Sequence, residues 1–222
     1  AGMVGLKTRR AEPGQVSVGQ DLMFGDDGLK RFTTHFQMGG EHSTIMVNYG
    51  HQDYEGFMVH TASQKEFVNV AAEFFPGTRQ VVSIYAGYSN SYDQRNGELT
   101  VGQYDTLDYT GNPAYIKNDA HSNVISFRAG VNHQYSFNRN LSNSTTVFGT
   151  GISSNVSSAG GWTDKSPVNY GARSVFEFAY PVGDNMHLTG KAGGEFQQQY
   201  AQIIGYGMVT NPDTNQFYNT IG

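Results

Sequence analysis

Cysteine is absent from the 222 residues, and charged residues are scarce. Without cysteine the chain has no disulfide framework, no thiolate metal site and no cysteine nucleophile. Charged side chains make up 15% of the sequence, compared with about 25% in an ordinary soluble domain. The net charge of -5 is spread along the chain without a cluster of Lys or Arg, which argues against a nucleic-acid partner.

Long apolar runs are missing as well. No segment approaches the roughly 18 consecutive apolar residues of a transmembrane helix. The opening, AGMVGLKTRR, has neither an initiator Met nor the apolar centre of a signal peptide. We therefore expect the chain to start inside a longer protein.

Catalytic motifs are also missing. The sequence contains no HExxH or GxSxG motif and no His pair at metal-ligand spacing, and its seven His residues are scattered. We predict a protein that is not an enzyme, with no catalytic residue, no metal site and no cofactor.

Aromatic residues and glycine are abundant. Aromatics make up 13% of the chain, and there are 28 glycines. Mean hydropathy is nevertheless low, at -0.48, because Asn, Gln, Ser and Thr are common. A transmembrane β-barrel has this composition, since its strands send apolar side chains to lipid and polar ones to a wet lumen. A secreted β-sandwich fits it too.

Alternating apolar and polar residues predict β-strands along the chain. In 123–137, the clearest segment, Phe127 and Val131 alternate with Ser126 and Asn132, and this period of two indicates a strand with one apolar face. The same reading predicts about nine strands: one before Gly25, and others around 31–38, 43–49, 68–74, 82–88, 123–137, 146–152, 173–180 and 186–197.

One predicted strand, 146–152, has large apolar residues on only part of its length. We place Phe148 and Ile152 on its apolar face and Gly149 and Gly151 on the opposite face.

The predicted links between strands alternate in length. Short links fall at 39–41, 75–80, 138–142 and 183–185, whereas long links fall at 50–63, 89–122, 154–170 and 200–222. An up-and-down outer-membrane barrel has tight turns at its periplasmic end and long loops outside. Aromatic residues such as Phe74, Tyr135 and Phe178 crowd the strand ends beside the short links, as in the aromatic girdle at a membrane interface. We therefore predict an all-β fold, part of an antiparallel up-and-down transmembrane β-barrel.

Several segments resemble TonB-dependent outer-membrane receptors of the siderophore-receptor type. GMVGLKTRRAEPG resembles the end of their plug domain and its linker, and GYSNSYDQRNGELT, NDAHSNVISFRAG and SSAGGWTDKSPVNYG are similar to segments of the barrel and its loops. The resemblance implies that residues 1–13 are the last plug strand and linker. It also implies that residues 14–222 are the first part of a barrel of about 22 strands.

The resemblance further implies a function and a location. These receptors lie in the bacterial outer membrane, in contact with its lipid, and take up a ferric siderophore or a similar metal chelate. The TonB energy-transducing complex drives uptake through the plug, and we expect the TonB box and most of the plug to precede this sequence.

Polar side chains of the predicted strands are expected to face the lumen. There they would contact the plug or hydrate the wall, and both interpretations stay open because porin lumens are polar as well. The set is Arg31, His35, Arg128, Asn132, Arg173, Glu177 and Lys191.

The long loop 89–122 is the best candidate for ligand contact. Tyrosine can stack on aromatic groups and cations can pair with oxyanions, and Trp162 adds a second loop. The candidates are Tyr92, Arg95, Tyr104, Tyr115, Lys117, His121 and Trp162.

The charge of this loop does not suit a simple anionic ligand. It carries five acids (Asp93, Glu98, Asp105, Asp108 and Asp119) and two cations (Arg95 and Lys117), and such a field repels a polyanion. Either the cations that receive the ligand lie elsewhere, or the ligand is neutral or cationic.

Two other functions are compatible with the sequence. A passive porin-like channel shares the girdle, the alternation and the unequal loops, and a soluble secreted β-sandwich would use its loops for binding. The N-terminal sequence of the whole protein distinguishes receptor from porin, and partition into membranes distinguishes both from the sandwich.

Overall fold

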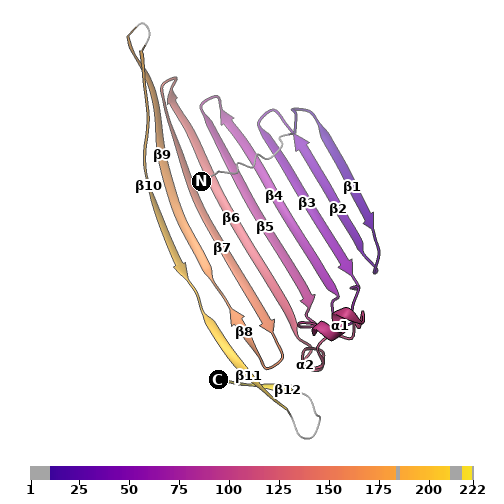
Figure 1. Ribbon diagram of the computed structural model, residues 1–222. Coiled ribbons are helices and arrows are strands. Elements are labelled where there is room, and N and C mark those ends of the chain that lie inside the picture. Colours follow the sequence, from indigo (N-terminus) through magenta and orange to yellow (C-terminus); the bar gives the residue numbers. More distant parts are fainter. Residues whose placement is uncertain (1–10, 184–185, 211–216, 222) are drawn as a thin grey trace.

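The protein is almost entirely β-structure (Figure 1). The computed structural model describes residues 11–183, 186–210 and 217–221, with side chains up to Gly207. Its strands are β1 (Val16–Phe24), β2 (Lys30–Gly39), β3 (Ser43–Tyr54), β4 (Ser63–Gly77), β5 (Gln80–Gln94), β6 (His121–Asn138), β7 (Leu141–Ser157), β8 (Gly161–Lys165), β9 (Val168–Gly183), β10 (Met186–Tyr200), β11 (Ile203–Thr210) and β12 (Phe217–Ile221). Two short helices, α1 (Val101–Asp105) and α2 (Pro113–Lys117), lie between β5 and β6.

All strands belong to one antiparallel sheet in which sequence neighbours pair from β1 to β7. The sheet forms a single layer (Figure 1). Among the described residues the only buried hydrophobic side chains are Ala11 and Ala120. Two packed sheets would enclose an apolar core between them, so the β-sandwich alternative is wrong.

The outer part of the sheet contains more strand than the sequence predicts. All nine predicted segments are strands, but β3 continues to Tyr54 and the predicted long links 154–170 and 200–222 contain β8, β11 and β12. The added residues of β3, at 50–54, and the residues of β8 are mostly polar, so backbone pairing continues there without the alternation by which a strand is recognised.

β8 and β9 form one strand that is interrupted only at Ser166 and Pro167. The register is unbroken across it, because β7 pairs Gly151 with Val168 and Ser154 with Lys165. β10 and β11 likewise continue one register along β9 and β8. Proline lacks the N–H that a ladder requires, which explains the break.

The registers give the sheet one apolar and one polar face. Ile84, Val131 and Val147 are consecutive cross-strand partners on the apolar face, and Val131 and Val147 remain 45% and 57% exposed. Large exposed apolar side chains on adjoining strands suit contact with lipid rather than water. The polar face carries the predicted lumen set.

The register corrects the predicted faces of β7. Phe148 and Ile152 oppose Gly130 and Ser126, so they lie on the polar face, while Val147 lies on the apolar face. The error came from following residue size along one strand. Phe148 fits the polar face because a neighbouring strand leaves space there: a Cβ on Gly171 would lie 2.8 Å from the Phe148 ring.

The apolar face has the height of a bilayer core. Along β6 it extends from Ile125 to Tyr135, about 33 Å at roughly 3.3 Å per residue and about 23 Å along the membrane normal at a tilt of ~45°. At its short-turn end, Tyr135 contacts Phe137 at a ring-centroid distance of 4.9 Å, and Phe137 contacts Phe176 at 6.2 Å. These contacts form an aromatic belt at one edge of the band.

None of the helices in the described ranges has the length and hydropathy needed to cross a membrane.

Candidate ligand-binding loops

Two long loops and one hairpin gather at the end of the sheet opposite the short turns (Figure 1). They are 55–62 between β3 and β4, 95–120 between β5 and β6, and the 158–160 turn between β7 and β8. We call these three segments the outer loops.

Loop 95–120 has a defined structure because its sequence caps two short helices. Thr100 and Gln103 form a capping box at the start of α1, and the Asn112 side chain accepts the Ala114 N–H at the start of α2. Gly97 has φ +72° and lies against the Tyr115 ring, where a Cβ would be 2.7 Å from a ring carbon. Glycine is therefore required at that position.

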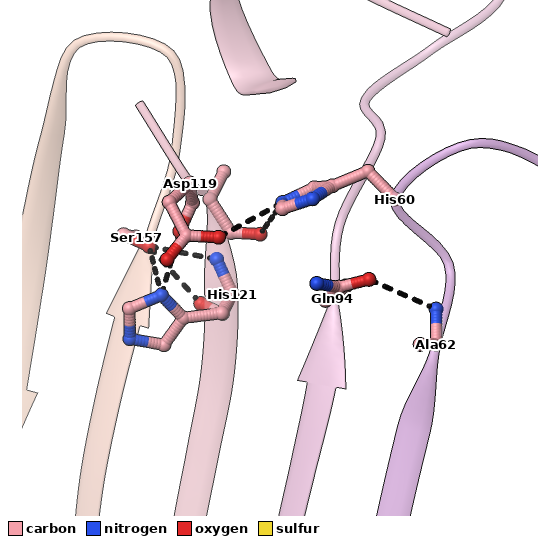
Figure 2. Close-up of polar contacts among 7 residues, drawn as sticks. His60, Ala62, Gln94, Asp119, His121 and Ser157 are labelled. Carbon is pink, nitrogen blue, oxygen red and sulfur yellow. Dashed lines mark hydrogen bonds and ion pairs between the residues drawn. The ribbon is translucent and has the colours of Figure 1, made fainter. Parts of the chain in front are cut away.

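A buried seam attaches loop 95–120 to the sheet (Figure 2). The Ser157 side chain, 1% exposed, accepts the His121 backbone N–H at 2.8 Å. The Ala120 carbonyl accepts the Arg95 backbone N–H at 2.8 Å. A buried donor or acceptor costs about 1 to 3 kcal/mol when it loses its partner, so these contacts fix the base of the loop.

Loop 55–62 is attached to the same seam by His60 (Figure 2). The His60 Nε2 lies 2.8 Å from the Ala120 carbonyl and 3.6 Å from an Asp119 carboxylate oxygen. The Gln94 side chain accepts the Ala62 N–H at 3.2 Å. The two loops are thus joined to each other as well as to the strands below them.

The predicted ligand residues divide into two groups. Tyr92 stacks on His121 at a centroid distance of 5.2 Å, Arg95 donates to the Ser157 carbonyl at 3.1 Å, and Trp162 contacts Tyr206 at 5.2 Å. These residues, like Tyr115 over Gly97, make contacts within the outer loops or between the ends of the strands beside them.

Tyr104 and Lys117 form the second group and point outward. Tyr104 is 72% exposed on α1, and Lys117 is an exposed residue in the last turn of α2. Both lie on the outer surface of loop 95–120, where a ligand arriving from solvent would meet them first.

The structure adds exposed apolar side chains that the sequence reasoning did not single out. Phe57, Val59, Val101 and Leu107 are all more than half exposed, and the Phe57 ring meets the Tyr109 ring edge-on at 6.2 Å. For Val101 and Leu107, the available signal was a large apolar residue within a loop that is rich in Gly, Asn, Asp and Thr.

An ionised carboxylate lies among these apolar residues. The Thr110 hydroxyl and backbone N–H both hydrogen-bond to the Asp108 carboxylate, the N–H at 3.1 Å, and these bonds lower the pKa of Asp108 below its usual value. Asp108 therefore keeps its negative charge at neutral pH.

The predicted lumen residues share the polar face and make contacts within it. His35 lies 2.8 Å from both Asp21 and Asn48. Ion pairs join Arg173 to Glu195 and Lys191 to Glu177, the Arg128 guanidinium lies 5.9 Å from the Tyr85 ring centre, and Asn132 donates to the Ser144 and Thr146 hydroxyls. Within the described residues no three His, Asp or Glu side chains gather as metal ligands would.

This geometry defines a class of protein by its fold. One up-and-down antiparallel layer, an apolar face of bilayer height, tight turns at one end and structured loops at the other are features of a transmembrane β-barrel. In the described residues β1 pairs only with β2, so the chain forms an open segment of such a barrel.

Solved structures with the same fold are receptors and transporters of ferric chelates. The ferric-catecholate import receptor Fiu of E. coli K12, in an open form, matches with a TM-score of 0.68, 12% identity and coverage of 95% of this chain and 38% of its own. The siderophore receptor PiuA of Acinetobacter baumannii matches with a TM-score of 0.74, 10% identity and coverage of 96% and 34%. The ferric citrate transporter FecA, unliganded, matches with a TM-score of 0.68, 12% identity and coverage of 95% and 32%.

The present chain thus spans about a third of the length of each matched structure. No protein-family model and no curated protein sequence matches it. At this level of identity the likeness establishes the fold.

Proposed function

We propose that this chain forms barrel wall and outer loops of a TonB-dependent outer-membrane receptor that takes up a ferric siderophore or a similar metal chelate. One observation carries the proposal: nearly the whole chain follows the fold of structures described as ferric-chelate receptors and transporters. The sequence segments that resemble the same family support it independently.

In this proposal the two ends of the sheet have different roles. The outer loops contact the chelate, and the polar face lines the lumen, where Arg31, Arg128 and their neighbours meet the plug. Residues 1–13 would be the last plug strand and linker. Of these, 1–10 lie outside the described residues, while Ala11 is buried and Gly14 donates its N–H to the Gly39 carbonyl at 2.8 Å.

The receptor would act by binding and release and would perform no bond chemistry. Loops fixed by buried hydrogen bonds lose little conformational freedom when a ligand binds, which favours binding from dilute solution. Release into the periplasm would require the plug to be displaced by the TonB complex. The chain described here supplies the wall for that movement and part of the binding surface.

The test is iron uptake by cells with and without the intact gene. Cells grown on single ferric chelates as the iron source should lose growth on at least one chelate after deletion. Uptake of radioactive iron should saturate with concentration and should stop when the inner-membrane proton gradient is collapsed. Uptake that rises linearly and continues without energy would instead identify a passive channel.

A second measurement tests location. The intact protein should fractionate with the outer membrane and require detergent for extraction. Recovery in the aqueous phase without detergent would contradict both the receptor and the channel.

A further inference from the structure

The exposed surface of loop 95–120 differs in chemistry from the base of the loop. Its outermost apolar side chains, Val101, Tyr104 and Leu107, recur at every third residue through α1 and the turn after it, and each is at least two-thirds exposed. Residues three apart lie on one side of a helical turn. We call these residues, together with Phe57 and Tyr109, the apolar crest.

The backbone at the crest holds an apolar side chain in solvent. Leu107 has φ +54°, a left-handed conformation that is unfavourable for a residue with a Cβ. Its N–H bonds to the Tyr104 carbonyl at 3.3 Å, and the next N–H, that of Asp108, bonds to the Gln103 carbonyl at 2.8 Å. The fold therefore fixes Leu107 outward, where it gains nothing from burial in the chain itself.

Acidic residues flank the crest and outnumber the basic residues on the exposed surface of loop 95–120. Glu98 and Asp105 are exposed, and hydrogen bonds from Thr110 hold the charge on Asp108. Of the basic residues, Arg95 donates to the Ser157 carbonyl at 3.1 Å, and Lys117 is exposed at the end of α2. The surface that an approaching ligand meets is thus apolar and aromatic, with more carboxylates than cations.

We propose that the apolar crest binds chelates that carry no net negative charge, with a preference for a cationic chelate that presents an apolar arm. This inference rests on the proposed function and narrows its substrate class. Apolar side chains contact the arm, tyrosine faces attract a cation, and the flanking carboxylates raise the local concentration of cations and lower that of anions.

The experiment compares chelates that differ only in charge. A linear iron(III) tris-hydroxamate with a free terminal amine is cationic, its N-acetyl derivative is neutral, and its N-succinyl derivative is anionic. Binding of each is measured with the protein from the intact gene in lipid nanodiscs, and uptake is measured in cells. We expect the cationic form to bind about fivefold or more tightly than the anionic form at low salt, with the ratio shrinking as salt screens the carboxylates.

Two sets of variants locate the effect. Glu98→Gln with Asp105→Asn should reduce the ratio between cationic and anionic forms to about twofold or less, since two of the three flanking charges are removed. The matched control is Glu12→Gln with Glu41→Gln, which removes two carboxylates at the opposite end of the sheet and should leave the ratio unchanged.

The apolar contacts are tested with Tyr104→Ser and Leu107→Gly. Both side chains are exposed, so these changes should leave the barrel folded. They should weaken binding of all three chelates, about tenfold for the neutral form, and more for the cationic form, because the Tyr104 ring no longer attracts the cation.

The outcomes separate this inference from the proposed function. Energy-dependent uptake of iron chelates with the anionic form preferred, or a charge ratio that is insensitive to Glu98 and Asp105, would overturn the inference and leave the receptor function standing. Failure of the intact gene to support uptake of any ferric chelate would overturn both.

Discussion

Replacing Val147 with Arg should destabilise the protein much more than replacing its neighbour Phe148. Val147 pairs with Val131, which lies near the middle of the apolar band. By strand rise and tilt, Val131 is about 9 Å from the edge of the band at the short-turn end. An Arg at the bilayer midplane costs about 2 to 4 kcal/mol. Phe148 is at the same depth on the polar face, where an Arg side chain reaches lumen water and the cost should be below about 1 kcal/mol.

The comparison needs a reference that removes the effect of side-chain size. Val147→Leu and Phe148→Leu provide it, because leucine is apolar and compatible with either face. The quantity of interest is the difference in free energy of unfolding between the Arg and Leu variants at each position. It is measured by denaturant-induced unfolding of the protein from the intact gene in lipid vesicles, with unheated gel mobility as the readout of the folded fraction.

Two results would refute the reasoning. Equal Arg penalties at the two positions would mean that the faces of β7 are not lipid and lumen. A larger penalty at Phe148 would support the assignment made from the sequence, in which Phe148 belongs to the apolar face.

Three further changes probe the linker and the outer loops. Gly39→Ala should displace the linker at Glu12 and speed proteolysis there, because the new Cβ would lie 2.1 Å from the Glu12 carbonyl oxygen. Gly40→Ala is the control and should have no effect, since the nearest atom to its new Cβ would be 3.5 Å away. Ser157→Ala should leave the His121 N–H without its partner and raise hydrogen exchange at the base of loop 95–120, for a cost of about 1 to 3 kcal/mol; unchanged exchange would show that the seam does not hold the loop. Thr110→Val should raise the pKa of Asp108 toward its usual value, which NMR of the carboxyl carbon would measure. The hydrogen bonds from Thr110 stabilise the loop fully at pH values above the usual Asp pKa, and this stabilisation is lost as the pH falls through the lowered pKa of Asp108. An unchanged titration of Asp108 would contradict this role.

The sequence was sufficient for the spanning strands and the two ends of the sheet. Residues 123–137 alternate so regularly that they can only be a strand with one apolar face, and the unequal links distinguish tight turns from outer loops. The reason is physical, because contact with lipid on one side and water on the other imposes a period of two on every spanning strand. Beyond the lipid that constraint ends, and there the predicted links proved to contain β8, β11 and β12.

The candidate site was predictable only as a region. Tyr104 and Trp162 were equally good ligand candidates in the sequence, yet Tyr104 stands in solvent and Trp162 packs on Tyr206. Residue type states what a side chain can bind, whereas its neighbours determine whether it is available.

The sequence by itself determined the strand pattern, the scarcity of charge and the resemblance to receptors, since these depend on local alternation and composition. Only the tertiary structure decided which face of β7 meets lipid, which loop residues support the seam, and where the acids lie relative to the apolar crest. Each of these depends on register and on contacts between segments far apart in the chain. The strand pairing of Gly130 with Phe148 and the hydrogen bond between His60 and the Ala120 carbonyl cannot be read from the order of the residues.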